Sequence, residues 1–145
     1  MTVTTRLLCA IDAAYPARLA VETAVEMAQV LRVPLAFLTI NPVCQEGPSE
    51  TQFWDDRIIA AVDAHLSNVL ADAAAIARRS GLSDFDCVMA SGINIAAAIV
   101  EYAQDRGFDH IVLGSSRPSM PVGATHGSVA AEIVRTARCP VTVVR

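Results

Sequence analysis

Five short apolar runs alternate along the chain with four longer stretches whose apolar residues recur at helical spacing. The runs are rich in aliphatic residues and bounded by polar residues, Gly or Pro, which is typical of buried strands. The expected strands are residues 6–11, 35–40, 84–90, 111–113 and 141–144, and the expected helices are residues 17–31, 52–80, 94–106 and 129–137. Strands that alternate with helices in this way predict a parallel, doubly wound α/β sheet.

Length and composition narrow the class of protein. A chain of 145 residues has the size of one domain, and we expect residues 1–145 to form it. A content of 53% hydrophobic and 18% charged residues suits helices packed on a buried sheet. The net charge of -4 and the scattered Lys and Arg residues make nucleic acid and acidic membranes unexpected partners. No apolar stretch reaches the roughly 20 residues that a membrane span needs.

The cysteines and histidines give little sign of a metal site or of disulfides. Cys9, Cys44, Cys87 and Cys139 show no CxxC spacing, so we expect buried, reduced thiols. His65 has no second ligand one helical turn away, which argues against metal binding. The first apolar run is too short for the core of a signal peptide, and a cytoplasmic location is therefore expected.

The last third of the chain has the pattern of an anion-binding corner. Gly114 ends the fourth expected strand, and Gly127 and Ser128 precede the last helix. Backbone N–H groups at a helix start attract anions, and the helix dipole adds roughly half a positive charge there. The same residues are also explained without a ligand, if the two glycines form turns and Ser128 caps the helix. Asp12, directly after the first strand, either faces a ligand at the sheet edge or caps the next helix.

These residues carry a resemblance to a known family. Gly114, two residues, Arg117, nine residues, then Gly127 and Ser128 resemble the G-x2-G-x9-G-[ST] signature of the universal stress protein family. The segment Cys139 to Arg145 is similar to that family's last strand, and the strand and helix order fits along nearly the whole chain. The resemblance implies a single-domain, Rossmann-like (adenine nucleotide alpha hydrolase-like) sandwich with strand order 3-2-1-4-5.

The resemblance also implies a ligand, an adenine nucleotide such as ATP, with Mg. Asp12 would lie near adenine and ribose, and the backbone near Ile40 would contact adenine. The phosphates would meet the corner, and the full set of implied binding residues is Asp12, Ile40, Gly114, Arg117, Gly127, Ser128 and Val129. Family members commonly form dimers through their last strand, so a homodimer through Val141 to Val144 is expected.

Arg117 departs from the pattern, because ATP-binding members have a glycine there. The Cβ of any residue other than glycine hinders close approach of a ligand to the backbone. The guanidinium of an arginine, however, can itself bind phosphate. Two hypotheses follow: a nucleotide-responsive regulatory protein, or a dimeric interaction module whose corner is closed by Arg117. An enzyme of another α/β family is a weaker third, since no GxxxxGK[ST] loop or set of catalytic residues is visible and at most slow ATP hydrolysis is expected.

Overall fold

A computed structural model of the chain describes residues 3–11, 18–42, 56–114 and 129–145. In chain order its elements are β1 (Leu7–Ala10), α1 (Arg18–Leu31), β2 (Leu35–Asn41), α2 (Asp56–Arg79), β3 (Phe85–Ser91), α3 (Ile95–Arg106), β4 (His110–Gly114), α4 (Val129–Thr136) and β5 (Val141–Val144). All strand pairs are parallel, and their order in the sheet is β3-β2-β1-β4-β5. The expected order 3-2-1-4-5 with four helices is confirmed.

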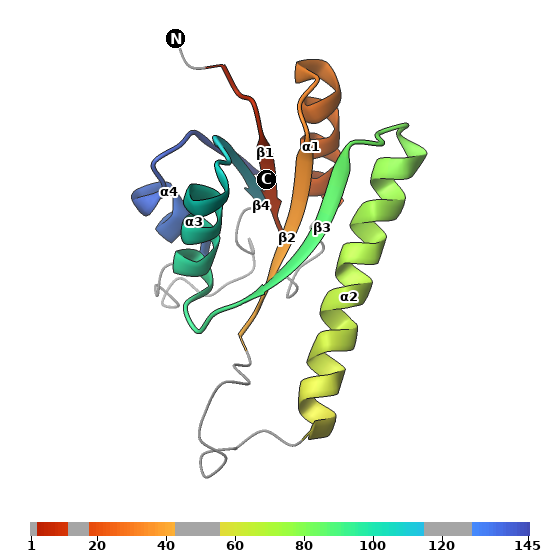
Figure 1. Cartoon of the computed structure of the whole chain (residues 1–145), viewed down its shortest axis with the longest axis vertical. Coiled ribbons are helices and arrows are strands. Elements are labelled where there is room, and N and C mark those ends of the chain that lie inside the picture. The colour runs from red at the N-terminus through yellow and green to blue at the C-terminus, as the bar shows by residue number, and fades with distance from the viewer. Residues whose placement is uncertain (1–2, 12–17, 43–55, 115–128) are drawn as a thin grey trace.

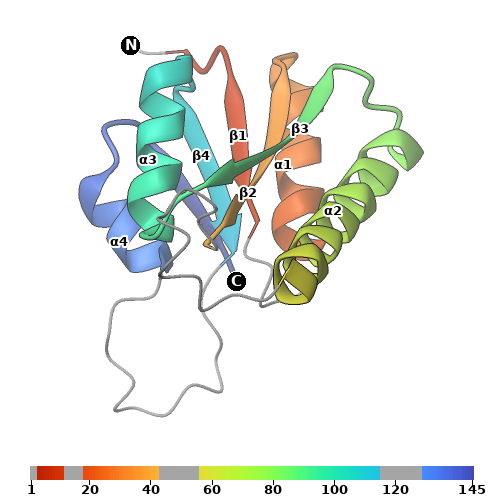
Figure 2. The ribbon, with the colours of Figure 1, turned by 60° about the horizontal axis from the view of Figure 1, so that its bottom comes forward.

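The helices cover the two faces of the sheet. In Figure 1, α1 and α2 lie on one side of the strands, and α3 and α4 lie on the other, which Figure 2 shows from a second direction. Successive residues of β1 point to opposite faces of the sheet. Leu7 and Cys9 pack toward α1 and α2, whereas Leu8 and Ala10 pack toward α3 and α4. Each large side chain buried in this way stabilises the fold by about 1.5–3 kcal/mol.

The buried stripe of α1 differs from the sequence prediction. The helical spacing of the apolar residues in 17–31 would place Leu19 and Leu31 on the core face, but they are 60% and 44% exposed. The buried residues of the helix are Ala20, Val21, Ala24, Val25 and Ala28. Since one residue turns a helix by about 100°, Leu19 falls beside this stripe rather than on it. Small alanines next to two valines let the helix approach the strands closely, which a face built on the leucines would prevent.

Two further residues that helical spacing alone would place on a core face are also exposed. Ile58 near the start of α2 is 44% exposed, and Val134 in α4 is 56% exposed. Leu66 is the first buried residue of α2, about two turns after Ile58. In α4, Ala130 and Ile133 fill the core. Val134 follows Ile133 directly, so it lies about 100° around the helix from this buried side.

The end of α2 forms the turn that the sequence predicts. Gly81 has a φ of 86°, a conformation that glycine adopts without strain. The N–H of Gly81 donates to the carbonyl of Arg78 and the N–H of Leu82 to that of Ala77, each at 3.0 Å. This pair of bonds is the Schellman motif, which satisfies the last carbonyls of a helix and stops it.

In the part of the chain that the structure describes, α2 is long and apolar enough over Arg57–Arg79 to cross a membrane, judged by length and composition. Its buried residues Leu66, Leu70, Ala73 and Ala77 belong to a core cluster with α1 and the sheet. We therefore interpret its apolar content as the packing face of a helix in an α/β layer.

The cysteines do not share one environment. Cys9 is fully buried in β1, and burial raises the pKa of its thiol to about 12, which makes it unreactive near neutral pH. Cys139 is half-buried, but Cys87 is exposed. The expectation of a buried thiol is therefore wrong for Cys87, because β3 lies at the edge of the sheet and is only partly covered. Cys44 lies outside the described residues.

Candidate functional site

The strand order reverses between β1 and β4. β1 pairs with β2 on one side and with β4 on the other, and the last register pairs of β1 join Ala10 to Leu38 and to Leu113. In open α/β sheets, ligands bind at the carboxyl ends of the strands where such a reversal occurs. We therefore searched this edge for ligand-binding groups. Of the predicted site residues, Asp12, Arg117, Gly127 and Ser128 lie outside the described residues.

Ile40 presents main-chain hydrogen-bonding groups at this edge. The N–H of Ile11 donates to the carbonyl of Leu38 at 2.8 Å, so Leu38 directs its carbonyl toward β1. Successive residues of a strand direct their backbone groups to opposite neighbours, and Ile40 therefore faces the same side as Leu38. Among the described residues, no register pair joins Ile40 to β1. The side chain of Ile40 is apolar and buried. The polar groups that this residue offers beside the reversal point are therefore its backbone N–H and C=O.

Asn41, the next residue, is anchored on two sides. Its side chain is buried, at 5% exposure, and its Nδ2 donates to Oδ1 of Asp63 on α2 at 3.0 Å. Its carbonyl accepts from the N–H of Gly92 at 3.1 Å. These bonds join the end of β2 to the helix above it and to the turn between β3 and α3.

Sequence reasoning missed the pairing of Asn41 with Asp63. Asn41 precedes Pro42, and the sequence pattern predicts a strand that ends before this pair, at residue 40. Asp63 lies 22 residues away on an exposed stretch of helix. A polar residue at the end of an otherwise apolar strand was the available signal, because such a residue needs a partner when it is buried.

Gly114 is the last residue of β4 and pairs with Val144. A Cβ at this position would lie 3.9 Å from the Cβ of Ala20, which is ordinary van der Waals contact. With respect to the residues that the structure describes, the fold therefore has room for alanine here. Gly92 differs, because a Cβ there would lie 2.8 Å from the Cβ of Ala98.

Val129 begins α4 at the same edge of the sheet. The helix returns the chain from the end of β4 to the start of β5, and since these strands are parallel, α4 begins near the carboxyl ends. The side chain of Val129 is half-buried and packs against the core cluster of Ala130 and Ile133. Its side chain is thus part of the core, which leaves its backbone as the part suited to a ligand. The structure brings Ile40, Gly114 and Val129 to one edge of the sheet.

Comparison with known proteins identifies the family. The model of the universal stress protein family matches residues 4–145. The chain belongs to the universal stress protein family. No relative was found among the curated proteins.

Solved structures with the same fold include three universal stress proteins. One, in complex with cAMP, is 21% identical, with a TM-score of 0.75 over 99% of this chain and 98% of that chain. UspA from Lactobacillus plantarum is 23% identical, with a TM-score of 0.71 over 100% of both chains. The protein from Archaeoglobus fulgidus in complex with dAMP is 20% identical, with a TM-score of 0.68 over 99% of this chain and 100% of that chain. At these identities the likeness establishes the fold.

Two surface hollows of this universal stress protein lie away from the reversal point. One of about 600 Å³ lies between the end of α2 and the start of β3, and its lining includes Arg78 and Phe85. The other, of about 250 Å³, lies between the end of α3 and the segment before β5. Both are near the amino ends of the strands, whereas the predicted ligand residues are at the carboxyl ends. We therefore do not assign the nucleotide to either hollow.

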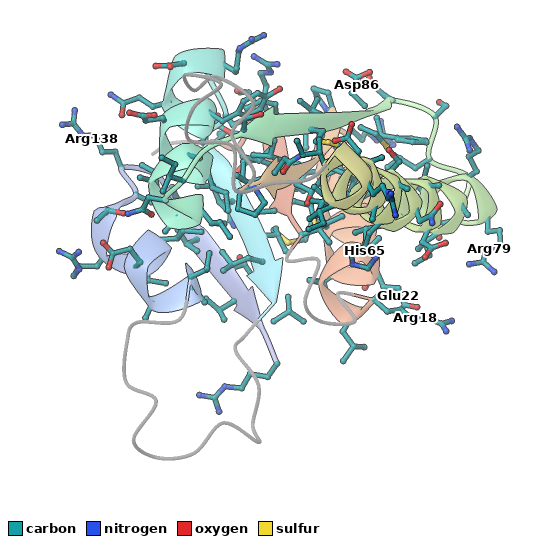
Figure 3. All side chains as sticks on the ribbon, turned by 90° about the horizontal axis from the view of Figure 1, so that it is seen from below. Arg18, Glu22, His65, Arg79, Asp86 and Arg138 are labelled. Atoms are coloured by element: carbon teal, nitrogen blue, oxygen red, sulfur yellow. The ribbon has the colours of Figure 1, made fainter. Side chains whose placement is uncertain are left out.

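The charges of the described residues are dispersed. In Figure 3, Arg79 and Arg138 extend from opposite sides of the molecule, and Arg18 lies beside Glu22, with which it forms an ion pair at 2.9 Å. Among these residues no group of three His, Cys, Asp or Glu is placed to hold a metal ion. His65 is exposed on α2, as expected for a surface histidine.

Proposed function

We propose that this universal stress protein binds an adenine nucleotide at the carboxyl edge of β1 and β4 and acts as a regulatory protein. The observation that carries the proposal is the direction of the Ile40 backbone toward β1, beyond the last register pair. Adenine presents an acceptor, N1, beside a donor, the N6 amino group, on its pairing edge. A main-chain N–H and C=O can bind both. Hypoxanthine has the same shape but a donor at N1 and an acceptor at O6, so the same groups should bind it less well.

The remaining contacts of the proposal come from the sequence. Asp12 would bind the ribose, and the backbone of Gly114 and Val129, with Arg117, Gly127 and Ser128, would bind the phosphates. The complexes of related proteins with cAMP and dAMP support an adenine ligand in this family. ATP with Mg is our more specific proposal, and the protein is proposed to act in the cytoplasm with at most slow hydrolysis.

Binding of the nucleotide can be measured on the purified protein. We expect AMP or ATP at millimolar concentration to raise the melting temperature and IMP to raise it less. A ligand at 100 times its Kd adds about 2.7 kcal/mol to the stability of the folded state. Mass spectrometry of the protein as purified would identify a retained ligand. Absence of both a retained adenine nucleotide and a shift in melting temperature would contradict the proposal.

Gly114→Ala tests whether the ligand approaches the end of β4. Because the fold accommodates a Cβ at Gly114, we expect an unchanged melting temperature without ligand. Affinity for AMP should fall at least tenfold if phosphate approaches this backbone closely. Equal affinity in the variant and the wild type would show that the ligand does not approach Gly114.

The second hypothesis, a module that binds no nucleotide, is separated by Arg117→Gly. If the wild type fails to bind AMP and the variant binds it, the arginine closes the site and the interaction module is the better description. If both bind equally, the arginine is compatible with the ligand. A weaker affinity in the variant would indicate that the guanidinium contributes to phosphate binding.

We further propose that the protein forms a homodimer through β5. This strand lies at the edge of the sheet, beyond β4, and Val143 on it is 38% exposed. An edge strand with an apolar side chain on its open surface favours antiparallel pairing across a two-fold axis. We propose no nucleic-acid or membrane partner, since the net charge is -4 and Arg138 lies on the opposite side of the molecule from Arg79 in Figure 3.

A further inference from the structure

We propose that Asp63 is a positioning residue for recognition of the nucleobase and that it acts through Asn41. The inference rests on the proposed function and assigns a role that the family signature does not contain. Its basis is the hydrogen bond from Asn41 Nδ2 to Asp63 Oδ1, 3.0 Å long, directly beside the backbone of Ile40.

The end of β2 needs such an anchor. Up to Leu38 the strand is held by β1 on one side and by β3 on the other. From Thr39 to Asn41 the register pairs among the described residues are all with β3. The backbone groups of Ile40 that face β1 therefore belong to a segment that is paired with β3 on its other side.

Asn41 supplies the missing restraint from the helix layer. It is 5% exposed and is one of two buried polar side chains, with Thr39, among the residues that the structure describes. A buried amide strongly prefers a satisfied position, and a bond to a carboxylate is stronger than one to a neutral acceptor. The side chain is held by Asp63 and the carbonyl by Gly92, so the peptide between Ile40 and Asn41 has a defined orientation. That orientation sets the direction of the Ile40 C=O, which belongs to this peptide, while the Ile40 N–H lies in the preceding peptide, within the register with β3.

Discrimination between two purines reports on this orientation. AMP and IMP have the same size but opposite donor and acceptor positions on the pairing edge. A general loss of structure weakens the binding of both, whereas a misdirected Ile40 backbone weakens AMP more than IMP. The ratio of the Kd for IMP to the Kd for AMP is therefore the quantity to measure, by calorimetry on the full-length protein.

Three substitutions separate positioning from simple destabilisation. Asp63→Ala removes the acceptor and should lower the ratio at least fivefold. Asp63→Asn keeps an acceptor oxygen and should retain most of the ratio. Asn41→Leu is close in size and shape, removes the donor and should lower the ratio as Asp63→Ala does, and it provides a second test if the alanine variant folds poorly. Asp72→Ala is the matched control, because Asp72 is an exposed carboxylate on the same helix.

The outcomes distinguish this inference from the proposed function. If the wild type binds neither AMP nor ATP, the proposed function fails and the role of Asp63 fails with it. If the wild type prefers AMP and Asp63→Ala keeps the same ratio, the inference is wrong while the nucleotide site stands. An equal fall of the ratio in Asp63→Ala and Asp63→Asn would also overturn it, since the bond that positions Asn41 is available to asparagine.

Discussion

At the scale of single residues, Gly92 and Gly114 show how one residue type serves two purposes. Gly92 follows β3 and lies so close to α3 that a Cβ would be 2.8 Å from the Cβ of Ala98 and 3.8 Å from Cγ2 of Ile40. Gly114 has space for a Cβ. The first glycine is required by packing. Packing does not require a glycine at position 114, so a requirement for glycine there would come from a ligand.

Gly92→Ala is therefore expected to destabilise the protein by about 1–3 kcal/mol, the usual effect of overpacking. The measurement is the free energy of unfolding from urea titration. Gly114→Ala is the control and should change it by less than about 0.5 kcal/mol. In the double variant Gly92→Ala/Ala98→Gly the contact is relieved, so its loss should be smaller than the sum of the two single losses. Additive losses would show that the two residues do not collide.

At the scale of elements, Asp109 joins the starts of β1 and β4. Its Oδ1 accepts from the N–H groups of Thr5 and Arg6, both at 3.0 Å. Its Oδ2 accepts from the N–H of Thr5 at 2.9 Å and from the Thr5 hydroxyl at 2.7 Å. Burial alone would raise the pKa of Asp109, but the bonds from Arg6 and Thr5 outweigh it and lower the pKa below the ordinary value of 3.8.

This lowered pKa predicts a pH-dependent contribution to stability. A carboxyl group whose pKa is lower in the folded state stabilises the fold above its unfolded pKa, and the contribution is lost as pH falls through the folded pKa. Asp109→Asn should therefore cost about 1 kcal/mol at pH 7, which is below the usual range of about 1.5–3 kcal/mol for bonds to a charged group because the site is partly exposed. The difference from the wild type should shrink as pH falls below about 4.

Urea titrations at pH 7, 4 and 3 would check this prediction. Asp105→Asn, an exposed carboxylate in the last turn of α3, is the matched control and should show a small difference at every pH. A difference for Asp109→Asn that stays constant from pH 7 to pH 3 would contradict a role of the ionised carboxylate.

At the scale of the whole molecule, the outer strands of the sheet are the places where two copies of the chain could pair. β3 and β5 are the outer strands. On the proposed dimer surface, Val143→Arg would place a charge within an apolar seam, and we expect it to convert a dimer into a monomer. Val30→Arg is the matched control, because Val30 is 75% exposed and lies on α1 rather than on the edge strand.

Light scattering at micromolar concentration measures the mass of each variant. The wild type and Val30→Arg should have twice the mass of the chain, and Val143→Arg should have the mass of one chain, 15.3 kDa. A monomeric wild type, or a dimeric Val143→Arg, would show that β5 does not carry the association.

The sequence by itself determined the elements, their order and the family. Local signals were sufficient because they act within a few residues: Asn94 caps α3 through a bond to the N–H of Ala97, and Gly107 ends it with a φ of 75°. The spaced glycines identified the family, and the order of elements together with the family resemblance placed Ile40, Gly114 and Val129 at one sheet edge.

Tertiary structure decided which residues face inward and which distant residues meet. Leu19 and Val21 both fit an apolar stripe in the sequence, and only the fit of α1 against the strands selected Val21. The bond between Asn41 and Asp63 depends on where α2 lies relative to β2, a placement that the core fixes and no local pattern encodes. Periodicity reflects residues that are close in the sequence, whereas packing brings together residues that are distant in it. The proposed positioning of the nucleobase depends on packing.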